Sequence, residues 1–168
     1  MLVIFSGLPG VGKSAIAADL GRRLHAPVIS VDPIEAAMLR SGIPQSFETG
    51  LAAYNVGAAI AEHQLRLGLT VIADAANYVE VGRSIWRQAA ANGQSPWRAI
   101  EVLCSDEQEH RRRLESRQRD LDPYPELTWD EVVRRRAETE PWVGDHLVLD
   151  SVRTVDDNVA LALDHLTA

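Results

Sequence analysis

The sequence predicts a three-layer α/β fold in which helices cover both faces of a five-stranded parallel sheet. Short apolar runs typical of buried strands alternate along the chain with longer segments of helical periodicity, and this alternation indicates βαβ units. The chain has 168 residues, of which 46% are hydrophobic and 24% charged, as is usual for a globular domain. We therefore expect residues 1–168 to form a single domain.

Five apolar runs predict the strands of this sheet. They span residues 2–6, 27–31, 69–73, 98–104 and 146–149. Four of the runs are almost continuously apolar, as expected for strands that are buried on both faces of a parallel sheet. Because the carboxyl ends of parallel strands meet at one edge, ligand-binding residues are expected directly after the strands.

Seven segments with helical patterns lie between and after the strands. In the first, Ile16, Leu20 and Leu24 recur every four residues and form one apolar stripe. Parallel strands joined through such helices use right-handed crossovers. The predicted helices span residues 13–25, 33–40, 49–67, 79–92, 106–118, 128–138 and 155–166.

The first strand leads into a glycine-rich turn, GLPGVGKS, which matches the pattern G-x-x-x-x-G-K-[ST] at Gly7, Gly12, Lys13 and Ser14. Glycines let successive N–H groups point at phosphate oxygens, and the following helix adds its positive N-terminal dipole. The lysine reaches the β- and γ-phosphates, and the serine hydroxyl ligates Mg²⁺. Lys13 is the only lysine of the chain, beside 16 arginines. The predicted nucleotide-binding residues are Gly7, Leu8, Pro9, Gly10, Val11, Gly12, Lys13, Ser14 and Ala15.

Two further strands end in an aspartate at the same edge of the sheet. Asp32 is the candidate base for an attacking hydroxyl or a ligand of that hydroxyl, although an aspartate before Pro33 could instead cap the helix 33–40. Asp74 is expected to hold Mg²⁺ through water. It could alternatively orient a substrate or serve as a structural turn residue.

Three polar residues are weaker candidates for ligand contacts. Asn77 and Arg83 follow the strand that ends in Asp74, and we expect them to contact the substrate. Arg153 follows the fifth strand and is a candidate for the base pocket. The segment 41–60, which lies between Asp32 and the third strand, is expected to line an acceptor pocket.

An arginine-rich segment is expected to form a helical lid at about residues 106–128. On a helix, Arg113 and Arg117 lie four residues apart on one face, and they are candidates to stabilise a transferring phosphate. The alternative is a solvated face on which the arginines pair with the interleaved acidic residues Glu109, Glu115 and Asp120. A second arginine cluster, 134–136, is expected to lie mostly on the surface.

Composition restricts the class of partner. A net charge of −7 argues against a broad nucleic-acid surface, although a local basic cleft is compatible with it. No apolar run approaches the ~20 residues that span a bilayer. The only cysteine, Cys104, is expected to be a small buried strand residue, and one cysteine permits no intrachain disulfide, which suits a reducing cytoplasm. With Lys13 as the only lysine, an Asn-Lys-x-Asp guanine-reading motif is absent.

With these residues in place, the chain resembles small P-loop kinases of the polynucleotide kinase, chloramphenicol phosphotransferase and zeta-toxin group. The resemblance rests on GLPGVGKS, on the strands ending in Asp32 and Asp74 with Asn77 nearby, and on the arginine-rich segment around Arg113 and Arg117. It implies a P-loop NTPase fold with strand order 2-3-1-4-5, and ATP and Mg²⁺ as cofactors. It also implies that Asp32 is the base and that the lid arginines contact the ATP phosphates.

The expected function is ATP-dependent transfer of the γ-phosphate to a hydroxyl of a small molecule. Two alternatives stay open: a kinase of polynucleotide or nucleoside 5′-hydroxyls, and a nucleotide-binding ATPase switch that does not use Asp32 as a base. A small-molecule acceptor is favoured over nucleic acid as the partner, and a monomer or homodimer is expected.

Overall fold

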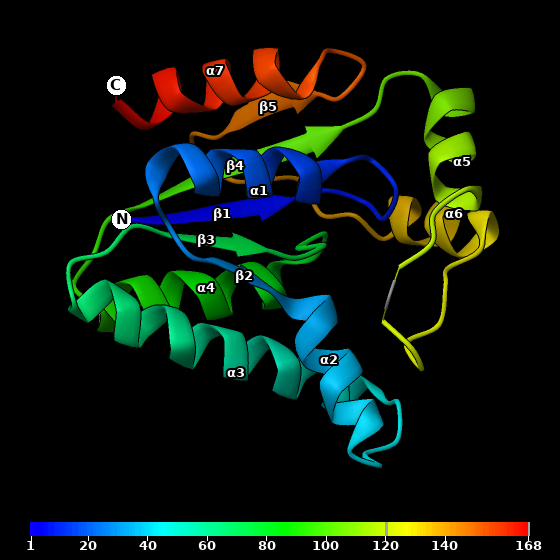
Figure 1. Ribbon diagram of the computed structural model, residues 1–168, viewed down its shortest axis with the longest axis horizontal. Coiled ribbons are helices and arrows are strands. Elements are labelled where there is room, and N and C mark those ends of the chain that lie inside the picture. The colour runs from blue at the N-terminus through cyan, green and yellow to red at the C-terminus, as the bar shows by residue number, and fades with distance from the viewer. Residues whose placement is uncertain (120, 168) are drawn as a thin grey trace.

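The computed structural model describes residues 1–119 and 121–167, in which strands and helices alternate along the chain (Figure 1). The elements are, in order, β1 (Leu2–Ser6), α1 (Lys13–Leu24), β2 (Val28–Ser30), α2 (Val31–Arg40), α3 (Phe47–Arg66), β3 (Val71–Asp74), α4 (Glu80–Asn92), β4 (Trp97–Leu103), α5 (Glu107–Glu115), α6 (Trp129–Ala137), β5 (Leu147–Asp150) and α7 (Val155–Thr167).

All five strands pair in parallel in the order β2-β3-β1-β4-β5, which confirms the expected sheet. The register places Asp74 opposite both Phe5 of β1 and Ser30 of β2. Helices α1 and α7 cover one face of the sheet, and α3 and α4 cover the other, while α5 and α6 lie beyond its carboxyl edge (Figure 1). This edge therefore gathers the ends of the three strands that carry the phosphate loop, Asp32 and Asp74.

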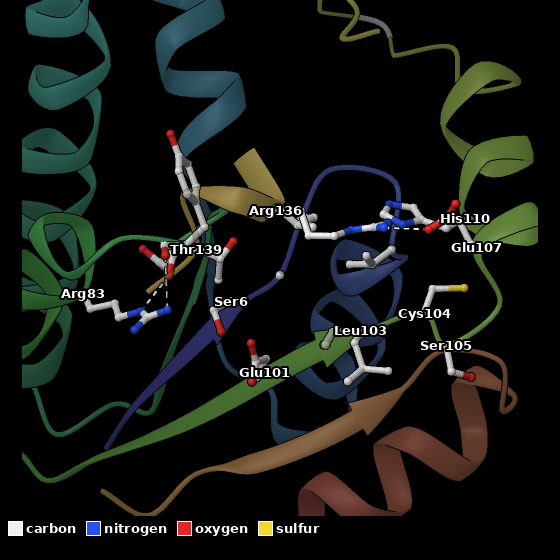
Figure 2. Close-up of a pocket in the computed structure, with 16 residues that line it drawn as sticks. Ser6, Arg83, Glu101, Leu103, Cys104, Ser105, Glu107, His110, Arg136 and Thr139 are labelled. Carbon is white, nitrogen blue, oxygen red and sulfur yellow. Dashed lines mark hydrogen bonds and ion pairs between the residues drawn. The ribbon is translucent and has the colours of Figure 1, made fainter. Parts of the chain in front are cut away.

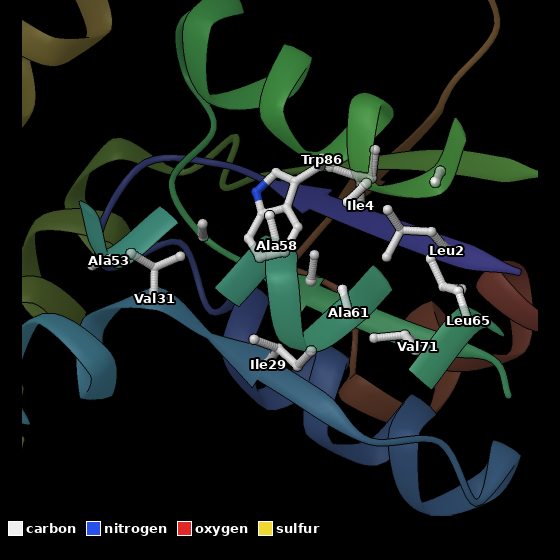
Figure 3. Close-up of a cluster of buried hydrophobic side chains, with 14 residues drawn as sticks. Leu2, Ile4, Ile29, Val31, Ala53, Ala58, Ala61, Leu65, Val71 and Trp86 are labelled. Carbon is white, nitrogen blue, oxygen red and sulfur yellow. The ribbon is translucent and has the colours of Figure 1, made fainter. Parts of the chain in front are cut away.

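The core consists of two hydrophobic clusters separated by the sheet. Alternate residues of β1 supply both clusters because successive side chains of a strand point to opposite faces. Leu2 and Ile4 pack against α3 and α4, where the indole of Trp86 is fully buried (Figure 3). Val3 and Phe5 pack on the opposite side, against α1 and α7. The central strand is thus held rigidly, and it delivers the phosphate loop from its carboxyl end.

Two helix boundaries differ from the sequence-based expectation in ways that matter for the site. Helix α2 begins at Val31 with Ser30 as its N-cap residue, so Asp32 lies inside the first helical turn and does not cap the helix. Helix α5 ends at Glu115, so Arg117 lies in the loop beyond it and shares no helical face with Arg113. Regular periodicity in the sequence did not reveal this early end.

Cys104 also differs from expectation. It follows β4 instead of lying within it, it is only half-buried, and its thiol contacts the carbonyl oxygen of Asp106 at 3.3 Å. Among the described residues, none of the helices combines the length and apolar character needed to cross a membrane.

Candidate active site

The phosphate loop connects β1 to α1, and its three glycines, Gly7, Gly10 and Gly12, all adopt a positive φ. Gly7 adopts φ 146°, and a Cβ there would lie 2.3 Å from the carbonyl oxygen of Val102. Gly12 adopts φ 93° and forms the N-cap of α1 without a capping side chain. The first N–H groups of α1 have no partners further up the helix, so they are free to bind an anion.

Lys13 is the first residue of α1 and is only 7% exposed. Among the described residues, no carboxylate forms an ion pair with its ammonium group. Its side chain and that of Ser14 line a cavity of about 200 Å³ together with Arg113 and Arg117. A buried, unpaired ammonium group beside exposed helix N–H groups is suited to phosphate oxygens.

Arg113 is fixed beside the phosphate loop by contacts with another strand end. Its guanidinium donates to the hydroxyl of Ser151 at 3.0 Å and to the Ser151 carbonyl at 3.1 Å, and it also pairs with Glu109. The arginines Arg112 and Arg113 hold the pKa of Glu109 down at about 2 by donating hydrogen bonds to its carboxylate. The geometry therefore orders Arg113 next to Gly12, where a bound phosphate chain would be within its reach.

The residues around Asp74 fit a divalent cation. Asp74 is 5% exposed, and its Oδ2 accepts a hydrogen bond from the hydroxyl of Ser30 at 3.0 Å. Its Oδ1 is buried and has no hydrogen-bond partner in the described part of the chain. Asp74 lines a second cavity, of about 270 Å³, with Lys13 and Ser14. An orphaned carboxylate oxygen near a free serine hydroxyl matches the preference of Mg²⁺ for oxygen ligands, most of which come from phosphate and water.

Asp32 lies on the other wall of this second cavity. Its Oδ2 accepts a hydrogen bond from Arg119 at 2.9 Å and lies 3.9 Å from a guanidinium nitrogen of Arg117. Burial lowers the pKa of Arg117, and the neighbouring charge of Arg119 adds to this effect. Two guanidinium groups therefore converge on the space between Asp32 and the phosphate loop.

A third cavity, of about 330 Å³, adjoins Asp32 on the side away from the phosphate loop. Its walls come from α2, the start of α3, the turn between β3 and α4, and Tyr124 and Arg135 from beyond the sheet edge. The segment 41–60 contributes Phe47, Leu51 and Tyr54, among others, and its expected role in lining an acceptor pocket stays a prediction. Asp32 is shared by the second and third cavities.

Arg119 is the residue of this site that sequence reasoning did not single out. Its side chain is 8% exposed and lies between the carboxylates of Asp32 and Glu126, with its guanidinium 4.8 Å from the ring centre of Tyr124. Arg119 belongs to the arginine-rich segment that the sequence analysis predicts to be a lid, so its general location was indicated. Periodicity cannot show, however, which of five arginines a loop directs back to α2.

Asn77 and Arg83 are held by hydrogen bonds within the protein itself, and their expected role as substrate contacts stays a prediction. Asn77 is 1% exposed, donates to the Phe5 carbonyl at 2.6 Å, and accepts a hydrogen bond from the Trp86 indole at 3.2 Å. Arg83 is also 1% exposed, and it donates to the carbonyl oxygens of Asn77, Glu140 and Pro141 at 2.7, 2.6 and 3.0 Å. Neither side chain lines the cavities that contain Asp32.

Arg153 is exposed in the turn between β5 and α7, and its proposed role in base recognition stays a prediction. In the arginine cluster at 134–136, Arg134 and Arg136 are exposed and Arg135 is half-buried. Arg135 lines the third cavity and lies over the ring of Tyr78, 5.8 Å from its centre. Arg136 pairs with Glu107 at 2.7 Å and stacks on Trp129.

The largest cavity described, about 480 Å³, lies behind the phosphate loop (Figure 2). The side chains drawn around it are largely engaged with the protein itself: Arg136 pairs with Glu107, and a ring nitrogen of His110 lies 2.8 Å from the Pro9 carbonyl. Burial lowers the pKa of His110. Because Lys13, Asp32 and Asp74 are not among its lining residues, we place the site in the other three cavities.

Comparison with solved structures shows the same fold in nucleotide-binding proteins. A putative kinase from Chloroflexus aurantiacus is 18% identical, with a TM-score of 0.77 over 98% of this chain and 97% of that chain. The APS kinase CysC of Mycobacterium tuberculosis, in complex with AMPPNP and APS, is 19% identical, with a TM-score of 0.72 over 99% and 97% of the two chains. Kti12 from Chaetomium thermophilum, in complex with ADP-AlF3, is 20% identical, with a TM-score of 0.65 over 98% of each chain.

The fold is therefore a P-loop NTPase fold, whereas the finer grouping with polynucleotide kinases and zeta toxins receives no support from these comparisons. A search among curated proteins finds no match to the sequence. A family model described as an AAA domain matches residues 2–139, which include the phosphate loop, Asp32, Asp74 and both lid arginines. This match covers most of the chain, which therefore belongs to the AAA_33 family of AAA domains.

Proposed function

We propose that this protein is an ATP-dependent kinase that transfers the γ-phosphate to a hydroxyl group of a small molecule. The observation that carries the proposal is the position of Asp32, which lines both the cavity beside Lys13 and Ser14 and the adjoining cavity of about 330 Å³. A carboxylate at this boundary can accept the proton of a hydroxyl bound in the outer cavity while the hydroxyl oxygen faces a phosphate held in the inner cavity. The names of two similarly folded proteins, a putative kinase and an APS kinase, support the same reaction class.

In the proposed reaction, Asp32 accepts the proton of the acceptor hydroxyl as the oxygen attacks the γ-phosphorus. The bond from that phosphorus to the β–γ bridging oxygen breaks, and the electron pair leaves with ADP. Lys13, Arg117 and Arg119 hold the negative charge that develops on the transferred group. Ser14 and Asp74 would hold Mg²⁺, which neutralises phosphate charge when bound.

This role requires Asp32 to exchange its present partner, since Arg119 donates a hydrogen bond to its carboxylate in this structure. ATP offers Arg119 phosphate oxygens that carry more negative charge than one carboxylate. We therefore expect nucleotide binding to draw Arg117 and Arg119 toward the phosphates and to release Asp32 for the acceptor.

The test is transfer of radioactive phosphate from γ-labelled ATP, with Mg²⁺, to pooled acceptors: hydroxylated metabolites, aminoglycoside and phenicol antibiotics, nucleosides and 5′-hydroxyl oligonucleotides. We expect a labelled small molecule. The variant Asp32→Asn should lower kcat at least ~100-fold, the scale of a lost general base, with the Kd of ATP nearly unchanged. Label found only on oligonucleotides would contradict the assignment of a small acceptor.

A second candidate function is a nucleotide-binding ATPase switch. The ion pair between Asp32 and Arg119 favours this function, because a carboxylate paired with an arginine is a weaker base for an acceptor hydroxyl. In that case the protein releases free phosphate, and Asp32→Asn leaves the rate of ATP hydrolysis unchanged. The same variant therefore separates the two functions, provided that ATP hydrolysis is measured both with and without the acceptor pools.

A further inference from the structure

The third cavity contains a buried carboxylate that the proposed transfer reaction does not use. Glu35 lies one turn after Asp32 on α2, on the same helical face, and is only 9% exposed. Burial raises the pKa of Glu35, even though a hydrogen bond from the Tyr124 hydroxyl opposes this shift. Across the cavity stands Gly50, where an added Cβ would lie 3.9 Å from Glu35 Oε1. The absence of a side chain at Gly50 leaves open space beside this carboxylate.

The rest of the cavity wall is mainly apolar and aromatic. Leu51, Tyr54 and Ile85 line its sides, and Phe47 and Val81 lie at its rim. Phe47 is 72% exposed and Val81 49% exposed, so Phe47 lies mostly in water and Val81 about half. A ligand with an apolar body would cover them and gain the free energy of removing that surface from water.

Charge in the cavity disfavours an anion. Asp32 and Glu35 contribute two carboxylates, and Arg135 contributes the one guanidinium among the lining residues. That guanidinium already lies over the ring of Tyr78. A sugar acid, a phosphorylated nucleotide or a nucleic-acid strand would bring further negative charge next to Glu35. Arg135 is the one cationic residue of the lining that could offset it, because Arg117 and Arg119 are directed at Asp32.

We infer that the acceptor is a non-anionic amphipathic alcohol, with its reacting hydroxyl on Asp32, an apolar or aromatic body between Leu51, Ile85 and Phe47, and an amine or second hydroxyl that donates to Glu35. This inference rests on the proposed kinase function, whose acceptor class it specifies. Glu35 thereby selects substrates by requiring a hydrogen-bond donor at a fixed distance from the reacting hydroxyl. A carboxylate at that position of the ligand would meet Glu35 directly and be rejected.

Three probes that share one benzylic alcohol test the inference: phenylethanolamine, phenyl glycol and mandelate. They place an ammonium, a hydroxyl and a carboxylate, respectively, at the same position relative to the reacting hydroxyl. Their binding to the AMPPNP-loaded protein is measured by ligand-observed NMR, and phosphate transfer to each is measured separately with labelled ATP. Gluconate and a 5′-hydroxyl oligonucleotide complete the panel.

We expect phenylethanolamine and phenyl glycol to bind at least ~10-fold more tightly than mandelate. The first two probes can each donate a hydrogen bond to Glu35, whereas the carboxylate of mandelate is repelled by it. Glu35→Gln should raise KM for phenylethanolamine by roughly 10-fold or more while kcat changes little. Glu62→Gln, on α3 outside the cavity, is the matched control and should change neither constant. Phe47→Ala should weaken all three probes without affecting unfolding, because its side chain is mostly exposed.

The outcomes separate this inference from the proposed function. Binding of the two favoured probes without transfer of label would refute the kinase and leave the acceptor-site chemistry standing. Transfer to gluconate or the oligonucleotide, with none to the favoured probes, would support the kinase and overturn the inferred acceptor class. Equal KM values for Glu35→Gln and the unmodified protein would also overturn it.

Discussion

Replacement of Arg83 tests most directly whether this residue acts in structure or in substrate binding. The change Arg83→Met keeps an unbranched stem of similar length and removes the guanidinium group. In the structure that group donates to three carbonyl oxygens at 3.0 Å or less, two of which belong to the 138–146 segment that returns from α6 to β5. It also lies 4.4 Å from the ring centre of Trp142. The side chain thus ties this segment to the start of α4.

The magnitude follows from these contacts. A hydrogen bond from a charged donor contributes roughly 1.5–3 kcal/mol net, but the three share one side chain and are not additive. Water can reach part of the freed carbonyl surface, since two of the bonds are only partly buried. We therefore expect a loss of about 3–5 kcal/mol in the free energy of unfolding, which is more than one such bond contributes and less than the sum of three. With an m-value of about 2 kcal/mol/M, the urea midpoint falls by about 1.5–2.5 M.

The assay is equilibrium urea denaturation followed by tryptophan fluorescence, and Arg87→Met is the matched control. Arg87 lies one turn further along α4 and pairs with Glu80 at the surface, so its replacement should cost less than about 1 kcal/mol. An unchanged midpoint for Arg83→Met, accompanied by a higher KM for the phosphate acceptor, would refute the reasoning and restore Arg83 as a substrate contact.

Three further predictions concern the site itself. Lys13→Ala should abolish ATP turnover while the circular dichroism spectrum stays native; preserved turnover would remove the phosphate-loop assignment. Arg119→Met should lower kcat by at least ~10-fold and change the Kd of the nucleotide much less, because Arg119 is expected to stabilise the transition state. A higher KM for ATP with an unchanged kcat would instead show that Arg119 contacts ATP only in the ground state. Burial raises the pKa of Glu35 in the folded protein above its value in the unfolded chain, which is about 4.3. The contribution of the protonated Glu35 to the free energy of unfolding is therefore complete below that unfolded pKa, and it is lost as the pH rises through the pKa of the folded protein. Glu35→Gln should therefore raise the melting temperature relative to the unmodified protein at pH 8 but not at pH 4, and the opposite sign would mean that Tyr124 and Arg135 outweigh burial.

The features that were predictable from the sequence are those whose causes lie within a few residues. The phosphate loop is one case, because the glycines, Lys13 and Ser14 that define it are contiguous and lie between an apolar strand and an apolar helical stripe. Asp32 and Asp74 are another, because a polar residue that ends a buried parallel strand, as Asp74 does, or that directly follows one, as Asp32 does, lies at the ligand-binding edge. The strand order came from the family resemblance, since periodicity carries no information about which strands are neighbours.

The features that were not predictable depend on partners distant in the chain. Arg83 looks like any surface arginine of an amphipathic helix until residues 140 and 141 approach it. Asn77 has the position of a substrate ligand, but Phe5 and Trp86 take up its amide. Arg119 reaches Asp32, 87 positions earlier, through a loop without periodicity. In each case a polar side chain finds its partner only after the chain has folded.

The single lysine has a practical consequence for chemical labelling. Across residues 1–168 the only ε-amine is that of Lys13, which lies at the start of α1 beside Gly12 and is 7% exposed. Amine-selective acylating reagents therefore have one side-chain target, and it coincides with the phosphate loop. Modification of that target, with and without ATP, would report occupancy of the nucleotide site through one mass increment in one peptide.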